Sequence, residues 1–213
     1  MIATGLFLTY YTSPVGVLEI KSSGEAIHAI LFVNAWKGPK LDEDEMAGNA
    51  NSNVIKLCTA QLDEYFEGKR RLFDFPFGQN GTAFQQKIWS ALLDIPFGKT
   101  ISYLELSKRT GNVKAIRAVG TTNGKNQLCI VVPCHRVIGA NGSLVGYGGD
   151  LWRKKWLLDH EAKYAHGVQE LGEWWGGGGV QGAGCKLQGS GCRLQVAGCR
   201  VQGTGFKFQG QNP

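Results

Sequence analysis

The sequence predicts an α+β protein, in which a small N-terminal α/β sheet unit precedes a mostly helical unit of the helix-turn-helix (winged-helix-like) type. Three observations lead to this prediction: strand-length apolar runs near the N-terminus, helical periodicity from Thr82 onward, and a glycine-rich repeat near the C-terminus. We therefore expect a sheet unit at 1–78, a helical unit at 79–164 and a disordered, low-complexity tail at 165–213.

The composition is that of a globular protein. Of the 213 residues, 43% are hydrophobic and 19% are charged, which is enough material for a real core. The chain has no apolar run of membrane-spanning length, and its first residues carry no basic leader, so we expect a soluble intracellular protein with reduced cysteines. The net charge of +6 suits a polyanionic partner but does not identify one.

The N-terminal unit begins with three strand-like runs, LFLTYYT, VGVLEIKS and AIHAILFV. The turn-forming pair Ser13-Pro14 joins the first two, and Ser23-Gly24 precedes the third. An acidic loop, LDEDEMAGNANS, leads to a predicted helix, VIKLCTAQLDEYF. Its expected inward face consists of Val54, Leu57, Cys58, Leu62 and Tyr65. A small sheet with a helix against it follows from this pattern.

The segment from Asp74 to Thr82, DFPFGQNGT, is typical of a linker. Thr82 can cap a helix that stops before Pro96. The residues expected to point inward from this helix are Phe84, Ile88, Ala91 and Leu92.

A helix-turn-helix is predicted by ISYLELSKRTGNVKAIRAVG. Ser102 caps a short helix, Thr110-Gly111 makes a tight turn, and a second helix starts at Val113 and carries Lys114 and Arg117. A nucleic-acid-binding helix and a helical pair with a solvated basic face are both consistent with this segment.

VVPCHRVIGANG places a cysteine beside a histidine, after an apolar lead-in that should bring Cys134 to the rim of a packed core. A thiol with a pKa of about 8.5 is mostly protonated at neutral pH, so a nucleophilic cysteine needs a base. His135 is the candidate, acting directly or through a water. A packed cysteine beside an ordinary histidine is the alternative. The six cysteines form no C-x-x-C pair, and no nearby cluster of histidines supplies zinc-site spacing, so we expect no metal. We expect no cofactor either.

From Val180 a seven-residue unit repeats: VQGAGCK, LQGSGCR, LQVAGCR, VQGTGFK. Each internal glycine costs about 1 kcal/mol in a helix, which disfavours a coiled coil. We interpret the repeat as translated repetitive DNA. An adhesive or metal-binding tail with three regularly spaced thiols is the alternative.

PCHRVIG resembles the active-site signature of the methylated-DNA–protein-cysteine methyltransferases, which repair 6-O-methylguanine. The resemblance extends from Phe84 to Glu161 through FQQKIWSALLDIPFGKTISYLELSKRTGNVKAIRAVGTTNGKN and VVPCHRVIGANGSLVGYGGDLWRKKWLLDHE. The N-terminal half resembles the family's variable α/β domain more loosely. A single-use repair enzyme is implied, which transfers the alkyl group of 6-O-methylguanine, and by extension of 4-O-methylthymine, to itself.

The resemblance also implies roles for individual residues. Cys134 is the alkyl acceptor, and His135 takes the thiol proton through a water. Glu161 orients His135, and Tyr103 donates a hydrogen bond or proton to ring nitrogen 3 of the base. The implied substrate is double-stranded DNA, bound by a monomer through the minor groove with the damaged base flipped out. The enzyme would work in the cytoplasm of a prokaryote or the nucleus of a eukaryote, without a membrane.

Further residues are implied in binding. Arg117 fills the place of the flipped base, and Lys114 and Arg136 contact DNA. The hinge and base pocket are formed by Asn126, Tyr147 and Gly148.

Two departures from the family pattern stand out. Gln127 follows Asn126 where the family often has proline, which predicts a looser hinge. Asp150 replaces a usual glycine, which predicts weaker phosphate approach or altered tolerance for larger alkyl groups. Two other functions remain open: a module that binds alkylated guanine without repairing it, although such members replace the cysteine, and a Cys–His–Glu acyl hydrolase.

Overall fold

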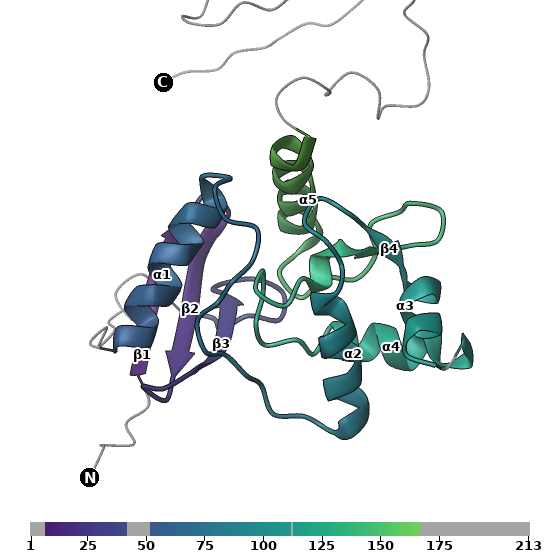
Figure 1. The fold of residues 1–213 in the computed structure, drawn as a ribbon, viewed down its shortest axis with the longest axis horizontal. Coiled ribbons are helices and arrows are strands. Elements are labelled where there is room, and N and C mark those ends of the chain that lie inside the picture. The colour runs from purple at the N-terminus through teal and green to yellow at the C-terminus, as the bar shows by residue number, and fades with distance from the viewer. Residues whose placement is uncertain (1–6, 42–51, 112, 167–213) are drawn as a thin grey trace, which may run out of the picture. The chain divides into compact units, whose positions relative to one another are not determined.

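The computed structural model describes residues 7–41, 52–111 and 113–166 (Figure 1). The predicted glycine-rich tail and its repeat lie outside these residues, apart from two positions at the end of the last helix. Most of the acidic loop lies outside them as well. The predicted α+β architecture is confirmed, with a small antiparallel sheet followed by a helical region. No helix in the described part of the chain is long and apolar enough to cross a membrane.

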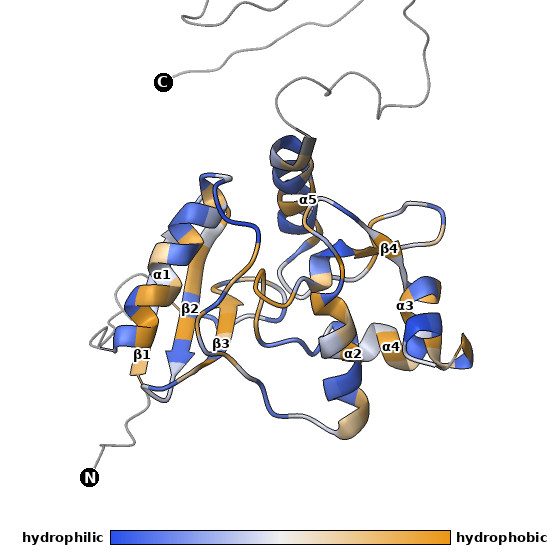
Figure 2. Ribbon diagram, in the orientation of Figure 1, coloured by the Kyte–Doolittle hydropathy of each residue, from blue (hydrophilic) through white to orange (hydrophobic). Residues whose placement is uncertain are grey.

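The N-terminal sheet contains three antiparallel strands in the order β1-β2-β3. They are β1 (Phe7–Ser13), β2 (Gly16–Ser22) and β3 (Ile27–Phe32), as the three apolar runs predicted. Ser13 pairs with Gly16 across the first hairpin. The Ser13 hydroxyl donates to the Gly16 carbonyl at 2.6 Å, which closes the turn at the predicted Ser13-Pro14 position. In Figure 2, β3 is mostly hydrophobic, whereas β2 contains both hydrophobic and hydrophilic residues.

Helix α1 (Asn53–Phe66) packs against this sheet (Figure 1). Its predicted inward face is largely correct, but Leu57 is 44% exposed. The buried face instead includes Gln61, whose side-chain NH₂ donates to Asp74 and whose carbonyl accepts from the Asp74 backbone N–H. A polar residue occupies this face because both ends of its amide are satisfied.

Helix α2 (Ala83–Leu93) begins at the predicted cap. Thr82 and Gln85 form a reciprocal capping box, in which each side chain accepts a hydrogen bond from the other residue's backbone N–H. The expectation that Phe84 points inward is wrong, since it is 38% exposed in the first turn. Trp89 is buried instead, and its indole N–H donates to the Thr122 carbonyl at 3.1 Å. This bond fastens α2 to the helix that ends at the site described below.

The helix-turn-helix follows strand β4 (Ile101–Ser102). Ser102 caps α3 (Tyr103–Arg109) by accepting the Glu105 N–H at 3.1 Å. Gly111 has φ = 81° in the connecting turn, a value that favours glycine. The second helix, predicted from Val113, starts as a 3-10 turn, η2 (Val113–Ala115), before α4 (Ile116–Asn123). Strand β5 (Val137–Ile138) pairs in parallel with β4, and α5 (Leu151–His166) is the last described helix.

Both halves of the described chain share the outer edge of β3. Ile27 bonds the backbone on either side of Phe77, with its N–H donating to Pro76 O at 2.9 Å and its carbonyl accepting from Gly78 N at 3.0 Å. Ile30 does the same around Leu128. The predicted linker is therefore packed along the sheet, and Phe75 within it is buried. The domain boundary at 78/79 stays a prediction.

A candidate active site around a buried thiol

Cys134 begins a single 3-10 turn, η3 (Cys134–Arg136), immediately after Pro133. The backbone leading to it is tightly folded, because Val132 N donates to Leu128 O and Cys134 N donates to Val132 O, at 2.9 and 2.8 Å. Ile130 adopts φ = 73°, an unusual conformation for a β-branched residue and one that costs free energy. The thiol is 4% exposed, which agrees with the expected position at the edge of the core.

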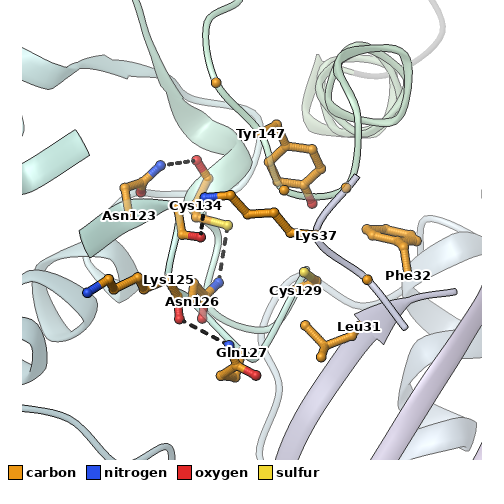
Figure 3. Close-up of a pocket in the computed structure, with 15 residues that line it drawn as sticks. Leu31, Phe32, Lys37, Asn123, Lys125, Asn126, Gln127, Cys129, Cys134 and Tyr147 are labelled. Atoms are coloured by element: carbon orange, nitrogen blue, oxygen red, sulfur yellow. Dashed lines mark hydrogen bonds between the residues drawn. The ribbon is translucent and has the colours of Figure 1, made fainter. Parts of the chain in front are cut away.

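A pocket of about 240 Å³ opens beside this thiol (Figure 3). Its walls come from the end of β3 and residues that follow it, from the segment after α4, and from the loop before α5. Tyr147 forms part of one wall, 4% exposed and edge-on to the Phe32 ring at 6.4 Å. Gly148 lies beside it, and its carbonyl accepts the Lys37 N–H at 3.0 Å. Both predicted pocket residues therefore line a cavity that contains Cys134.

Asn126 holds the segment that carries the thiol. Its Nδ2 donates to Cys134 Sγ at 3.1 Å (Figure 3). The same nitrogen donates to Val132 O at 2.8 Å, and Oδ1 accepts the Leu128 N–H at 3.0 Å. An amide N–H directed at sulfur favours the thiolate over the thiol. Asn126 thus connects the end of the helix-turn-helix to the reactive atom.

His135 and Glu161 are both fully buried and meet at 2.9 Å, between Nε2 and Oε1. The carboxylate accepts from Nε2, so the imidazole proton is held there and Nδ1 is left as the acceptor. Nδ1 has no hydrogen-bond partner within the described structure. Burial lowers the pKa of His135, although the Glu161 charge opposes this, so the ring is neutral and able to accept a proton at pH 7.

Glu161 is the centre of a larger network. Burial alone would raise its pKa, but the charge that His135 carries once protonated, the Arg136 charge and the hydrogen bonds of both residues outweigh burial and hold the pKa well below its usual range. Tyr65 OH donates to Oε1 and Gly98 N donates to Oε2, both at 3.0 Å. The carboxylate is therefore ionised and fixed from several sides.

Arg136 corrects the sequence-based expectation of a DNA contact. It is 5% exposed, bonds Glu161 through Nε at 2.8 Å and Nη2 at 2.9 Å, and donates to Ile95 O at 2.6 Å. A guanidinium held in this way is a structural partner of Glu161 and is not available to a phosphate.

Lys154 is a feature that the sequence analysis missed. It is fully buried on α5, and Nζ donates to Val137 O at 2.7 Å and Val145 O at 2.9 Å. Burial lowers the pKa of Lys154 to about 8, so it is charged at pH 7. The helical spacing 154, 157 and 161 could have revealed it, because Leu157 and Glu161 share its buried face.

The Cys134 thiol feels two opposing influences. Burial raises its pKa, whereas the Asn126 hydrogen bond and the Lys154 charge lower it, and the net direction is upward. The thiol of the unliganded pocket is therefore protonated at neutral pH, and a base is needed when it reacts.

Tyr103 lies at the first turn of α3, half-buried beside the thiol segment. Its hydroxyl is 3.4 Å from Val145 O and accepts from Asn123 Nδ2 at 3.4 Å, and the same amide donates to Cys134 O at 3.3 Å. Burial, followed by the nearby Cys134 sulfur, raises the pKa of Tyr103, so it remains a proton donor.

Lys114 and Arg117 are exposed on the helix-turn-helix, at η2 and the start of α4. They do not line the pocket. Helix α4 nevertheless leads into it, because its last residue, Asn123, contacts the Cys134 carbonyl.

Both departures from the family pattern have hydrogen-bond partners in the structure. The Gln127 N–H donates to Gln79 Oε1 at 2.7 Å, which gives the hinge an anchor that the expectation of a looser hinge did not include. Asp150 adopts φ = 69°, accepts from Arg153 Nη1 at 2.6 Å and from Trp36 N at 3.0 Å. Its charge is therefore paired with Arg153, which argues against the expected repulsion of phosphate.

Comparisons with known proteins agree with this geometry. Residues 83–163 match the family described as 6-O-methylguanine DNA methyltransferase, DNA binding domain, and residues 6–79 match its ribonuclease-like domain. The chain is 40% identical over 156 residues to a methylated-DNA–protein-cysteine methyltransferase of Methanosarcina acetivorans, covering 73% of this chain and 98% of the relative. A protein of the same name from Haemophilus influenzae is 41% identical over 162 residues, covering 74% and 87%.

Solved structures are similar as well. The structure of Mycobacterium tuberculosis OGT in complex with DNA aligns with a TM-score of 0.66 and 37% identity, over 74% of this chain and 93% of that one. The described residues contain no group of three or more His, Cys, Asp and Glu side chains that could hold a metal ion.

Proposed function

The chain belongs to the 6-O-methylguanine DNA methyltransferase family, a family of DNA-repair enzymes, and we propose that it transfers the alkyl group of 6-O-alkylguanine to its own Cys134. The observation that carries this proposal is the environment of the thiol. Cys134 lines a pocket, receives the Asn126 N–H at 3.1 Å, and precedes an imidazole that Glu161 holds at 2.9 Å. A nucleophile and a base are then buried on consecutive residues, and a carboxylate orients the base.

In the proposed reaction, the bond from Sγ to the alkyl carbon forms as the bond from that carbon to guanine O6 breaks. The thiol proton passes through a water to Nδ1 of His135, and the departing guanine takes up one proton, so protons balance. Glu161 stabilises the imidazolium that forms. Tyr103 supplies the hydrogen bond or proton to ring nitrogen 3, which makes guanine a better leaving group.

The product is a thioether, so each molecule acts once. A carbon–sulfur bond of this kind is not an acyl bond, and a His–Glu pair has no means of hydrolysing it. We extend the proposed substrates to 4-O-methylthymine, whose alkyl carbon is bound to oxygen in the same way.

The proposed substrate form is duplex DNA bound by a monomer, with α4 in the minor groove. The Mycobacterium tuberculosis relative has been solved in complex with DNA, and Lys114 and Arg117 are exposed on the corresponding motif here. An alkylated base within a stacked duplex cannot reach a buried thiol, so it must be flipped out, at a cost of a few kcal/mol. Arg117 would occupy the vacated place in the stack.

The test is stoichiometric methylation. The protein is mixed with a duplex containing one 6-O-methylguanine, and its intact mass is followed. We expect one methyl group per protein molecule, located on Cys134 by fragmentation of the tryptic peptide Asn126–Arg136, which also contains Cys129. Methylation that persists in Cys134→Ala, or a thiol that turns over an ester repeatedly without being modified, would contradict the proposal.

A further inference from the structure

Gln79 lies outside the machinery described so far, yet it is bonded to the residue that touches the thiol. It is half-buried in the segment before α2. Its Nε2 donates to Asn126 Oδ1 at 2.9 Å, and its Oε1 accepts the Gln127 backbone N–H at 2.7 Å. Both ends of the Gln79 amide are therefore used on the two residues of the hinge.

These contacts form a directed chain of three hydrogen bonds. The Gln127 N–H donates to Gln79, the Gln79 NH₂ donates to Asn126, and the Asn126 NH₂ donates to Cys134 Sγ at 3.1 Å (Figure 3 shows the last). A backbone N–H can only donate, so it fixes the orientation of the Gln79 amide, which in turn fixes that of Asn126. Bonds aligned in one direction also polarise and strengthen one another.

The alternative orientation of Asn126 would be harmful to the reaction. If its amide turned over, Oδ1 would face the sulfur and repel a thiolate. Two donors hold Oδ1 away from sulfur, the Leu128 N–H at 3.0 Å and the Gln79 NH₂. The Leu128 donor belongs to the backbone, whereas the Gln79 donor belongs to a side chain and can be removed by substitution without altering the backbone.

We propose that Gln79 is a positioning residue, which acts through Asn126 to keep an N–H directed at the Cys134 sulfur. The chain depends on a residue other than proline at position 127, because proline has no N–H to donate. The departure from the family's Asn-Pro pattern is then coupled to Gln79. This inference rests on the proposed function for its biological meaning, but the thiol can be tested without DNA.

Other groups also act on the thiol and are identical in every variant of the test, so the loss of the Lys154 charge above its pKa of about 8 affects all of them alike. The titratable side chains whose charges are coupled to Cys134, or that adjoin it, come from α3, α5, η3 and the pocket loops: Tyr103, Lys154, His135, Cys129 and Tyr147. Since none of them contacts Gln79 in the described hydrogen bonds, a change at Gln79 reaches the thiol through Asn126.

The experiment measures the rate at which iodoacetamide alkylates Cys134 from pH 6 to 10, resolved from Cys129 by fragmentation of peptide Asn126–Arg136. In Gln79→Leu, and in Gln79→Ala should the leucine variant not fold, the midpoint should move upward by about half a pH unit to one unit. The rate at pH 7 then falls about three- to tenfold, and the difference from the wild type becomes smaller as the pH is raised toward 10.

A matched variant separates positioning from loss of packing. Gln86 Nε2 donates to the backbone carbonyl of Gln79 at 2.6 Å. Gln86→Ala therefore loosens the same segment but leaves the side-chain amide of Gln79 and the three-bond chain intact. We expect Gln86→Ala to retain the wild-type midpoint. An unchanged midpoint in the Gln79 variants, or an equal shift in Gln86→Ala, would overturn the inference.

A double-mutant cycle tests the direction of the chain. Gln127→Pro removes the N–H that orients Gln79. Adding Gln79→Leu to Gln127→Pro should therefore raise the midpoint of Cys134 alkylation by less than Gln79→Leu does in the wild-type chain. Equal shifts of the midpoint in both backgrounds would show that Gln79 acts independently of Gln127 and would refute the coupling. If methyl transfer fails in the wild type while these thiol titrations behave as expected, the proposed function is wrong and the positioning role stands.

Discussion

The Glu161 carboxylate accepts a hydrogen bond from Nε2 of His135 at 2.9 Å, and neither side chain has any exposed surface. Arg136, the next residue in the chain, bonds the same carboxylate with two of its nitrogens. Two consecutive residues, His135 and Arg136, therefore bind the same carboxylate. The acid–base pair and the integrity of the fold depend on the same carboxylate.

Glu161→Gln should lower both stability and the rate of methyl transfer. The amide leaves the Arg136 charge buried without a counter-ion, which costs about 3–5 kcal/mol when a buried pair is broken. Tyr65→Phe is the matched control, because it removes one hydrogen bond to Glu161 and keeps the charge, at a cost of about 1 kcal/mol. Urea unfolding measures the loss of unfolding free energy in each of the two variants. Equal losses in the two variants would contradict a dominant role for the charge.

Acid should destabilise the protein in a window set by Glu161. Its folded-state pKa is depressed, so its contribution to stability is fully present above the unfolded value of about 4.3 and is lost as pH falls below it. His135, whose pKa is also lowered, adds a loss of the same sign that begins below about pH 6.5. Unfolding free energies from pH 7 to pH 3 should fall less steeply in Glu161→Gln than in the wild type.

Lys154→Met should make the thiol less reactive. The ammonium lies among carbonyl groups, and its charge lowers the pKa of Cys134, so its removal raises that pKa further. We expect methyl transfer at pH 7 to slow by about tenfold for each unit by which the Cys134 pKa rises, and the rate to recover as the pH is raised. Lys154→Arg, which keeps the charge, should slow the reaction less. Identical rates for the two variants at pH 7 would exclude a charge effect.

Lys114 and Arg136 should respond differently to salt. If exposed Lys114 contacts a phosphate, Lys114→Ala reduces the slope of log affinity against log salt concentration by about 1, measured by fluorescence anisotropy with duplex DNA. Arg136→Met should leave that slope unaltered and lower the melting temperature, because Arg136 is buried against Glu161. A reduced slope in Arg136→Met would restore the DNA contact first expected of it.

Thr82→Ala should cost about 1 kcal/mol of unfolding free energy, because it removes one half of the capping box of α2. Thr82→Ser retains the hydroxyl and serves as the control. The reactivity of Cys134 toward iodoacetamide should be the same in both variants, since Thr82 contacts no residue of the pocket wall in the described hydrogen bonds.

Local rules were sufficient for much of the fold. The strand-like apolar runs predicted β1 to β3. Capping by Thr82 and Ser102 predicted the starts of α2 and α3, because a cap depends on residues within one turn. Leu57 and Phe84 were wrongly predicted to be buried. Periodicity indicates which face of a helix is apolar, but not how far the surface that packs against that face extends.

The site required more than local rules. Cys134 and His135 are adjacent in the sequence, but Glu161 lies 26 residues beyond His135, and only the family resemblance singled it out among the acidic residues. The interpretation of Gln127 did not include its partner Gln79, which lies 48 residues away and is not revealed by any local pattern. Asp150 likewise accepts from Trp36, 114 residues away, but its ion pair with Arg153 has an i,i+3 spacing that a local pattern can indicate.

The pairing along β3 also matters for how the protein behaves in a crowded solution. Without the stretches around Phe77 and Leu128, Ile27 and Ile30 would present unpaired backbone donors and acceptors on this side of the sheet. An open edge of that kind is a template for a strand from another chain, and so for aggregation. The backbone that fixes the thiol segment in place therefore also keeps this edge from recruiting foreign strands.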